Sequence, residues 1–257
     1  MTGKGTLFLI PVFLGPANSN FLSQHLIQIV HDLKHFIVED EKTARGFLKA
    51  LAIPTALPEI SLSQLNEHTA SGDMEELLSP LLNGHDCGLM SEAGSPGIAD
   101  PGSELIFLAH RKGIKVVPLA GPSSILLGLM ASGMNGQYFS FNGYLSRESN
   151  ERCIQLKELE KKVIRKNETQ LFIETPYRNA ALLEDIKKTL QPETLLCIAC
   201  NINAPEELIF TQSIREWKSS KLDFQKKPCI FIIGQPAFHA ISKRSQASQH
   251  RQRQYRK

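Results

Sequence analysis

The sequence has no long hydrophobic run. Nowhere in its 257 residues do eighteen apolar side chains follow one another, whereas a helix needs about 20 of them to cross a bilayer. We therefore expect no membrane span. The first apolar stretch, TLFLIPVF, has neither a charged leader nor an Ala-x-Ala-like cleavage site, so we interpret it as a strand rather than as part of a signal peptide.

Several nucleotide-binding and hydrolase motifs are also missing. The chain has no G-x-x-x-x-G-K-[ST] phosphate loop and no G-x-G-x-x-G after its first strand, which argues against a P-loop enzyme and an ordinary dinucleotide-binding domain. It has no G-x-S-x-G elbow and no H-E-x-x-H helix, which argues against the hydrolases and zinc proteases that depend on them.

Cysteine is scarce and odd in number. The five cysteines are Cys87, Cys153, Cys197, Cys200 and Cys229, and most stand in apolar segments. This usage is typical of reduced thiols in the cytoplasm. Cys197 and Cys200 form a C-x-x-C, but TLLCIACNI resembles a buried strand, and no second C-x-x-C or histidine pair accompanies it. We expect no metal site.

Charge is unevenly distributed along the chain. The net charge is +3, but residues 237–257 contain no acidic residue and carry six cations, at 243, 244, 251, 253, 256 and 257. The remainder is therefore mildly acidic. We expect this tail to lack a core and to be disordered. It is either a solvated end or a contact for RNA phosphates, and the sequence leaves both open.

Strand-like and helix-like segments alternate. Strands are expected at 6–12, 35–40, 86–90, 114–121, 169–175, 193–200 and 227–234, and a new part of the chain begins at 138–145. Helices are expected at 21–33, 43–53, 74–82, 103–113, 122–132, 150–166 and 177–190, with caps at Asn18, Ser19 or Asn20, at Asp73 and at Ser103. The alternation predicts an α/β fold with mainly parallel sheets. We expect two tandem α/β domains, 1–118 and 119–236, followed by the tail 237–257.

One expected loop is unusually rich in glycine and proline. SEAGSPGIADPG, residues 91–102, contains three glycines and two prolines and follows the apolar run CGLM. Open α/β sheets bind ligands at the carboxyl ends of parallel strands. Glycine lets a ligand approach the backbone, and proline lowers the cost of ordering the loop. The alternative is a purely structural loop, because glycine and proline punctuate all loops.

Five segments in order resemble the tetrapyrrole methylase superfamily, and within it the 16S ribosomal RNA (cytidine-2′-O)-methyltransferase family. They are GTLFLIPVFLG, VEDEKTARGFL, LMSEAGSPGIADPG, VVPLAGPSSILLGLMASGM and FIETPYRNAALLEDI. The third and fourth are long and specific, and the five together span nearly the whole chain.

The resemblance implies a two-domain homodimer that binds S-adenosylmethionine in a cleft between its domains and methylates RNA. The implied cofactor-binding residues are Ser91, Glu92, Ala93, Gly94, Ser95, Pro96, Ile98, Gly121, Ser123 and Ser124. Substrate contacts are expected from Lys42, Arg45 and Arg178. For Arg178, a structural ion pair with Glu174 is the competing interpretation.

A ribose hydroxyl is a poor nucleophile, so a base or hydrogen-bond acceptor would help it attack. The candidates are Glu39 and Asp40, at the end of the second expected strand, and Glu92 in the glycine loop. Alternatively, these carboxylates cap helices or pair with Lys42 and Arg45.

The chain departs from the family pattern in several places. Pro16 replaces an asparagine, Glu41 and Lys42 replace Thr-Arg, and Glu92 replaces an aspartate. The family's A-R-E-L-T-K segment corresponds to ACNINA, so its Arg, Glu and Lys become Cys200, Asn201 and Ala204.

These changes keep two other hypotheses open. One is methylation of a porphyrin-like or other small molecule, although the macrocycle branches usually show G-D-P where this chain has Gly94-Ser95-Pro96. The other is a non-catalytic RNA- or ribosome-binding relative.

Overall fold

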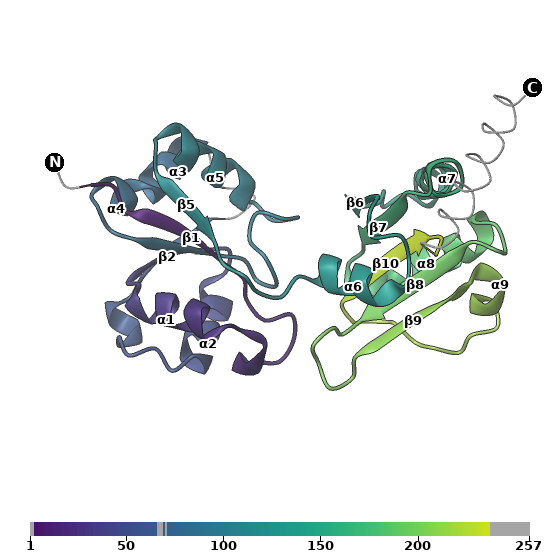
Figure 1. Ribbon diagram of the computed structural model, residues 1–257, viewed down its shortest axis with the longest axis horizontal. Helices are drawn as coiled ribbons and strands as arrows, with labels where there is room; N and C mark the ends of the chain where they lie inside the picture. Colours follow the sequence, from purple (N-terminus) through teal and green to yellow (C-terminus); the bar gives the residue numbers. More distant parts are fainter. Residues whose placement is uncertain (1–2, 66–68, 70, 237–257) are drawn as a thin grey trace, which may run out of the picture. The chain divides into compact units, whose positions relative to one another are not determined.

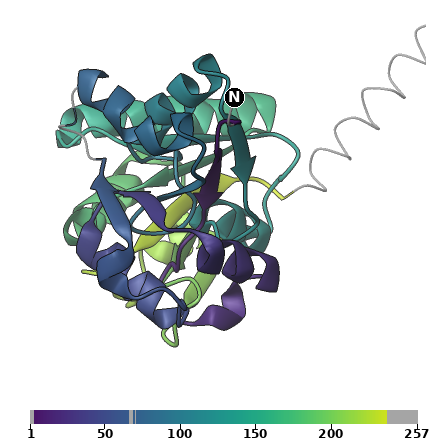
Figure 2. The same cartoon turned by 90° about the vertical axis from the view of Figure 1, so that its left-hand side faces the viewer.

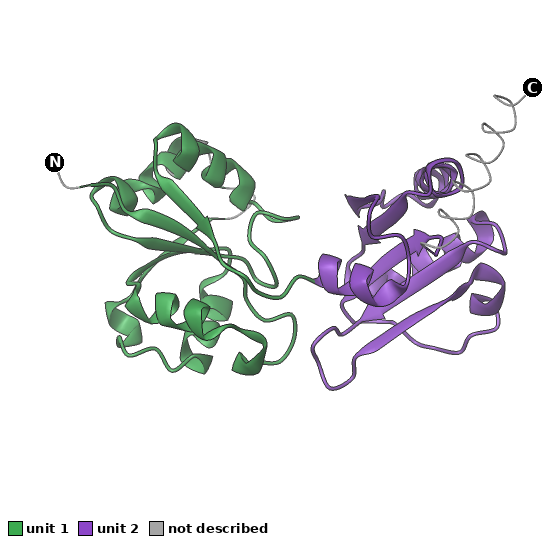
Figure 3. Ribbon diagram, in the orientation of Figure 1, with its two compact units in different colours: residues 1–123 green, residues 124–257 purple. Residues whose placement is uncertain are grey.

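A computed structural model describes residues 3–65, 69 and 71–236 of the chain. The chain divides into two compact units, unit 1 with residues 1–123 and unit 2 with residues 124–257 (Figure 3). Residues 119–123 thus belong to unit 1, whereas the sequence analysis assigns them to its second domain. The basic tail, residues 237–257, lies outside the described residues, so its predicted disorder stays a prediction.

Unit 1 contains a five-stranded sheet in the order β3-β2-β4-β1-β5. Its strands are β1 (Thr6–Ile10), β2 (His35–Val38), β3 (Ser61–Gln64), β4 (Cys87–Met90) and β5 (Lys115–Pro118). Every pairing in it is parallel. Strand β4 is apolar throughout because both faces of a parallel sheet are covered. Strand β3, SLSQ, has too few apolar residues to be foreseen from sequence.

Helices cover both faces of this sheet (Figures 1 and 2). The helices of unit 1 are α1 (Gln24–Asp32), α2 (Glu41–Ala50), α3 (Ser71–Leu77), α4 (Ser79–Leu82) and α5 (Gly102–Arg111), with 3-10 turns at Ser19–Phe21 and Leu57–Glu59. Helices α1 and α2 pack on one face through Leu26 and Leu48. On the other face, α4 and α5 pack through Leu81 and Leu105. The two apolar layers hold the strand ends in place.

The caps expected for three helices are not the residues that precede those helices in the structure. Helix α1 begins at Gln24 with Ser23 as its cap, because Asn18 instead caps the preceding 3-10 turn. Helix α5 begins at Gly102 after Pro101, so Ser103 lies in its first turn. Asp73 lies within α3 rather than before it. Competing polar residues near a helix start make such caps hard to rank from sequence.

Unit 2 contains a second five-stranded sheet, in the order β6-β7-β10-β8-β9. Its strands are β6 (Phe139–Tyr144), β7 (Thr169–Ile173), β8 (Leu195–Cys200), β9 (Leu208–Ser213) and β10 (Cys229–Gly234). Only β6 and β7 pair in parallel, and the other three pairings are antiparallel. The expectation of a mainly parallel sheet is therefore wrong for unit 2. The short connection from β8 to β9, a strand that the sequence analysis missed, has no room for a crossover helix.

Both faces of the second sheet are also covered. The helices of unit 2 are α6 (Ser124–Ser132), α7 (Ser149–Lys166), α8 (Asn179–Thr189) and α9 (Ile214–Trp217), with a 3-10 turn at Pro176–Arg178. Phe172 and Phe231 of the sheet lie in the core beneath α7 and α8, and Trp217, the last residue of α9, packs into the same core. Helix α6 lies against the other face, where Gly128 approaches Ile230. In the described part of the chain, no helix combines the length and the apolar character that crossing a bilayer requires.

Candidate active site at the strand ends of unit 1

The predicted site lies at one edge of the first sheet. Because β1, β2, β4 and β5 are parallel neighbours, the loops that follow them meet at their carboxyl ends. These loops begin at Pro11, Glu39, Ser91 and Leu119. The glycine loop follows β4 near the middle of this edge, and its last residue, Gly102, begins α5.

Hydrogen bonds tie the glycine loop to its neighbours on the β1 and β5 side. The Val12 amide donates to the Gly94 carbonyl over 2.8 Å. On the β5 side, the Ser95 hydroxyl donates to the Pro122 carbonyl over 3.3 Å. The loop is therefore held in one position before any ligand arrives, which lowers the entropic cost of binding.

Two glycines are required by this packing. Gly94 has a φ of +74°, in the left-handed region that side chains rarely adopt. At Gly121, a Cβ would lie 2.5 Å from the Cβ of Pro11, too close for any side chain. Gly94 is buried beside Leu14, whereas Gly121 is exposed. Among the described residues, the amides of Ala93 and Gly121 donate to no protein group, so both are available to a ligand.

On the β2 side, the glycine loop carries acidic groups. The Glu92 amide donates to Oε2 of Glu39 over 3.1 Å, which joins two of the three predicted bases. Asp100 lies close enough to Glu39 and Glu92 for their negative charges to act on its carboxyl group. Burial raises the pKa of Asp100 to about 6, and the negative charge of Glu39 adds to the shift. A hydrogen bond from Ser91 opposes it.

Asp100 also lines a small cavity of about 10 Å³, together with Glu39, Ser91 and Pro96. Its Oδ2 atom is buried and has no partner among the described residues. A cavity needs roughly 10–15 Å³ to hold one water molecule. Burial, nearby like charges and an unpaired oxygen are features that functional carboxyl groups share.

Asp100 is not among the bases predicted from the sequence. It stands in the A-D-P-G run of the segment that carried the family resemblance, so the motif itself was the available signal. Its proximity to Glu39 could not be read from sequence, because 61 positions that fold through two crossovers separate them.

The other predicted residues near Glu39 make local contacts. Oδ1 of Asp40 accepts from the Thr43 amide over 2.7 Å and thereby caps α2. Hydrogen bonding to Thr43 lowers the pKa of Asp40. Arg45 pairs with Glu41 at 3.2 Å on the surface of α2, and Lys42 is exposed on the same helix. The capping that the alternative interpretation expects is thus present for Asp40, whereas Arg45 pairs with Glu41 and not with one of the three predicted bases. The roles of these groups in catalysis and substrate binding stay predictions.

The predicted cofactor residues differ in exposure. Ser91, Gly94 and Pro96 are buried; Ser95 and Ser123 are half-buried; Glu92, Ala93, Ile98 and Gly121 are exposed. Ser124 is the first residue of α6 and belongs to unit 2. Apart from Ser124, the predicted set therefore lies on the glycine loop and on the segment after β5.

Arg178 belongs to unit 2, where it precedes α8. Its Nε donates to Oε1 of Glu174 over 2.9 Å and to the Thr175 hydroxyl over 3.2 Å. The Glu174 side chain is 1% exposed and that of Arg178 is 29% exposed. The structural ion pair is present, and the Arg178 side chain is partly exposed.

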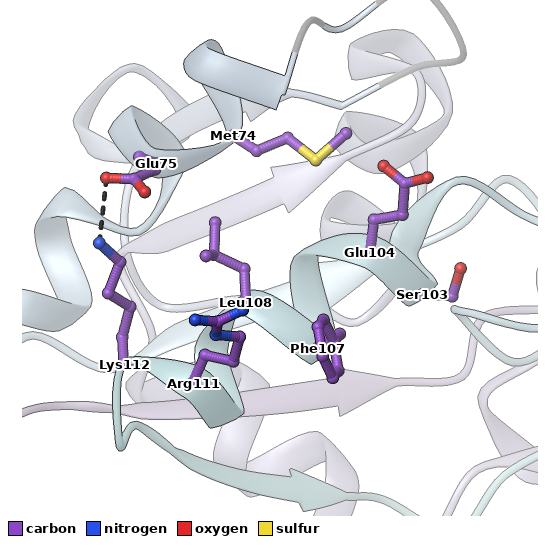
Figure 4. A pocket seen from close by; sticks show the side chains of 8 residues that line it. All are labelled: Met74, Glu75, Ser103, Glu104, Phe107, Leu108, Arg111 and Lys112. Carbon is purple, nitrogen blue, oxygen red and sulfur yellow. Dashed lines mark hydrogen bonds and ion pairs between the residues drawn. The ribbon is translucent and has the colours of Figure 1, made fainter.

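A second hollow of unit 1 lies between α3 and α5 and has a volume of about 770 Å³ (Figure 4). It is lined by Met74, Glu75, Ser103, Glu104, Phe107, Leu108, Arg111 and Lys112. Lys112 pairs with Glu75 at 3.0 Å inside it. None of the predicted site residues lines this hollow. Within the described residues, no group of three or more His, Cys, Asp or Glu side chains is placed to hold a metal ion.

Comparison with known proteins gives matches over most of the chain. The family model of the Tetrapyrrole (Corrin/Porphyrin) Methylases matches residues 9–217. The ribosomal RNA small subunit methyltransferase I of Vibrio cholerae is 30% identical over 80% of this chain and 68% of its own length. Its counterpart in Pasteurella multocida is 28% identical over 89% of this chain and 79% of its own length.

Solved structures show the same fold. The methyltransferase CobJ aligns with a TM-score of 0.60 and 17% identity over 91% of this chain and 95% of its own. The cobalt precorrin-4 methyltransferase CbiF, a cobalamin biosynthetic enzyme, aligns with a TM-score of 0.58 and 11% identity over 89% of this chain and 94% of its own. At these identities the likeness concerns the fold alone.

Proposed function

Because the chain belongs to the tetrapyrrole (corrin/porphyrin) methylase family and is therefore a methyltransferase, we propose that it methylates ribosomal RNA of the small subunit at a ribose 2′-hydroxyl. The observation that carries the proposal is the extent of the family match. Residues 9–217 include the glycine loop, the acidic groups beside it and Arg178. The relatives with 28% and 30% identity are both ribosomal RNA methyltransferases.

We assign the cofactor, S-adenosylmethionine, to the carboxyl ends of β1, β4 and β5. Bound there, it supplies a methyl group that is already activated on a positively charged sulfur. The free amides of Ala93 and Gly121 suit the polar edges of a nucleoside. Glu39 and Glu92 place negative charge near a cationic ligand. That unit 2 closes this site, as the family resemblance implies, stays a prediction.

We assign acceptance of the hydroxyl proton to the carboxylates beside the glycine loop. The carboxylate of Asp40 caps α2. Glu39, Glu92 and Asp100 are therefore the remaining candidates for the base. A general base works best when its pKa lies near the working pH. The pKa of Asp100, raised to about 6, meets that condition better than an ordinary carboxyl group. Glu39 and Glu92 contribute the charge that keeps it raised.

The remaining parts of the proposal concern partners. Arg178 and the exposed Lys42 and Arg45 supply positive charge for RNA phosphates. A homodimer and a cytoplasmic location follow from the family resemblance and stay predictions. A porphyrin-like substrate is less well supported, because the cobalamin enzymes match at 11% and 17% identity only.

The test is transfer of radiolabelled methyl from S-adenosylmethionine to small ribosomal subunits from a strain that lacks the gene. We expect label in 16S RNA, mapped to a 2′-O-methyl by alkaline resistance. Glu39→Gln, Glu92→Gln and Asp100→Asn are compared with Glu59→Gln, an exposed carboxylate on another turn. The variant that removes the base should lose about 10²–10⁴-fold in kcat, whereas Glu59→Gln should not change it.

Two outcomes would contradict parts of the proposal. Binding of the cofactor by calorimetry without label in any RNA would remove the RNA assignment, and precorrin or uroporphyrinogen substrates would then be assayed. Absence of cofactor binding would favour the non-catalytic RNA-binding alternative.

A further inference from the structure

Two cysteines of unit 2 lie directly opposite each other. Strands β8 and β10 are antiparallel, and their register pairs Cys200 with Cys229. The Asn201 amide donates to the Pro228 carbonyl over 3.0 Å and extends the pairing by one position. Directly opposite residues of an antiparallel pair have Cα atoms about 4.5–5.5 Å apart. This spacing falls within the roughly 4.4–6.8 Å that a disulfide requires.

Both side chains point to the same face of the sheet. Cys200 and Cys229 belong to the core beneath α7 and α8. The interaction between the two thiols lowers the pKa of Cys200 and raises that of Cys229, while burial raises both. The positive charge of Lys227 also lowers the pKa of Cys200, whereas Asp223 opposes it. Because the thiolate, and not the thiol, is the nucleophile, the cysteine with the lower pKa, Cys200, is the better nucleophile of the two.

The C-x-x-C motif is not the reactive pair. Cys197 and Cys200 stand three positions apart on one strand, so their side chains point to opposite faces. Their Cα atoms are then about 10 Å apart, beyond the reach of a disulfide. Cys87 belongs to unit 1, and Cys153 lies on α7. Since all five cysteines are described, Cys200 and Cys229 form the pair that the strand register selects.

A small oxidant can reach this pair from one end. The pair stands where β8 ends and β10 begins. Cys200 is 1% exposed and Cys229 is 8% exposed. Pro228, the neighbour of Cys229, is exposed, and Asn201 and Lys227 are half-buried. The thiols thus lie just beneath the surface rather than at the centre of the core.

We propose that Cys200 and Cys229 are a redox-modification site, at which a peroxide converts two thiols into a disulfide that joins β8 to β10. The Cys200 thiolate attacks a peroxide oxygen, breaks the O–O bond and becomes a sulfenic acid, while hydroxide leaves and takes up a proton. The Cys229 sulfur then attacks the Cys200 sulfur, and a second water leaves. The two sulfurs lose two electrons, and one hydrogen peroxide is reduced to two water molecules.

The disulfide would act on the segment that distinguishes this chain from its family. Cys200 takes the place of an arginine in the family's A-R-E-L-T-K segment, and residues 201–207 follow it directly. A bond to Cys229 fixes the start of that segment to the end of the loop before β10. The inference rests on the cysteines alone and holds whatever the substrate of the enzyme is.

The experiment treats the reduced full-length protein with hydrogen peroxide, removes the excess, and alkylates the remaining thiols in denaturant. Peptide mass spectrometry should find a Cys200–Cys229 peptide pair lighter by two hydrogens, which dithiothreitol separates. Calorimetry should show the melting temperature of the oxidised protein raised by about 5 °C, since the bond restricts the unfolded chain. Both effects should vanish in Cys200→Ser and Cys229→Ser.

Cys197→Ser is the matched control, because Cys197 is as buried as Cys200 but on the opposite face of the same strand. It should keep the linked pair and the rise in melting temperature. If Cys200 and Cys229 are both fully alkylated while Cys153 is oxidised, the proposal is wrong. A bond from Cys200 to Cys197 or Cys153 would overturn it too. The mapping uses the wild-type chain, so it decides the matter even if a serine variant does not fold.

Discussion

At the scale of single residues, the chemistry of the site depends on where each carboxyl group is placed. Asp40 and Glu39 are adjacent in sequence, yet Asp40 accepts bonds from Thr43 that lower its pKa, while Glu39 accepts from the Glu92 amide. The pKa of Asp100 is shifted in the opposite direction from that of Asp40, because burial and negatively charged neighbours disfavour the ionised form of Asp100. Three carboxyl groups of similar intrinsic acidity therefore have different surroundings and different hydrogen-bond partners.

The raised pKa of Asp100 predicts a pH-dependent effect on stability. Its ordinary pKa is 3.8, and in the folded protein it is about 6. The folded state therefore binds this proton more tightly, and its stability falls as the pH rises from about 4 to about 6. Above pH 6 the folded state holds an unfavourable charge. Asp100→Asn should then raise the melting temperature by about 2–4 °C at pH 7.5, with little change at pH 3.5.

Asp32→Asn serves as its control, because Asp32 is exposed on α1 beside Gln28. Its melting temperature relative to the wild type should not change between pH 3.5 and pH 7.5 in the way expected for Asp100→Asn. An Asp100→Asn variant that is less stable than the wild type at pH 7.5 would mean that the ionised carboxylate is needed for the fold.

Arg178 and Glu174 make a second prediction at this scale. Arg178→Ala leaves the Glu174 carboxylate buried without its cation, which should cost about 3 kcal/mol of unfolding free energy. The double variant Glu174→Gln with Arg178→Met should recover most of this loss, because no charge is then buried alone. Denaturant titration measures both. Equal stability of Arg178→Ala and the wild type would leave the pair without a structural role.

At the scale of elements, the glycine loop depends on backbone conformation more than on side chains. Gly94→Ala places a Cβ at φ +74° and 3.1 Å from Leu14. Gly133 has a similar φ of +72° but open space around it, in unit 2. Both alanine variants should lose about 1 kcal/mol of stability from the left-handed conformation.

Only Gly94→Ala should also weaken cofactor binding, by at least tenfold in Kd, because it displaces the loop that is tied to Val12. Isothermal titration calorimetry with S-adenosylmethionine separates the two effects. Equal affinity of the Gly94 and Gly133 variants would show that the glycine loop does not hold the cofactor.

The elements also show where local patterns mislead. The alternation of strands and helices correctly indicates the parallel sheet of unit 1. In unit 2 the same alternation conceals an antiparallel sheet, because β9 was missed and β10 inserts between β7 and β8. Strand β9, LIFTQS, lies at the sheet edge with a polar half and has little hydrophobic signal.

At the scale of the whole molecule, charge separates the body from the tail. The six cations of residues 237–257 come with no acidic residue. We expect that a chain ending at Pro236 binds RNA more weakly. The log–log slope of affinity against salt should be less steep by about 0.7–0.9 for each RNA phosphate that the shortened chain no longer neutralises. Filter binding between 50 and 200 mM salt measures this slope, and cofactor affinity should be unchanged.

A tail variant with its cations replaced by glutamine gives the matched comparison for the truncation. An identical slope for the full-length chain and both variants would show that the tail is a solvated end, which is the alternative that the sequence left open.

Sequence by itself determined the class of fold, the glycine loop and the family, because these depend on residues that are close along the chain or on motifs of fixed spacing. It also placed Glu39 and Asp40 at a strand end. Only the tertiary structure decided which residues meet. The proximity of Asp100 to Glu39, the pairing of Cys200 with Cys229 and the strand order of unit 2 all join segments that are distant in sequence. Such contacts depend on packing and burial across the whole unit, and no local pattern encodes them.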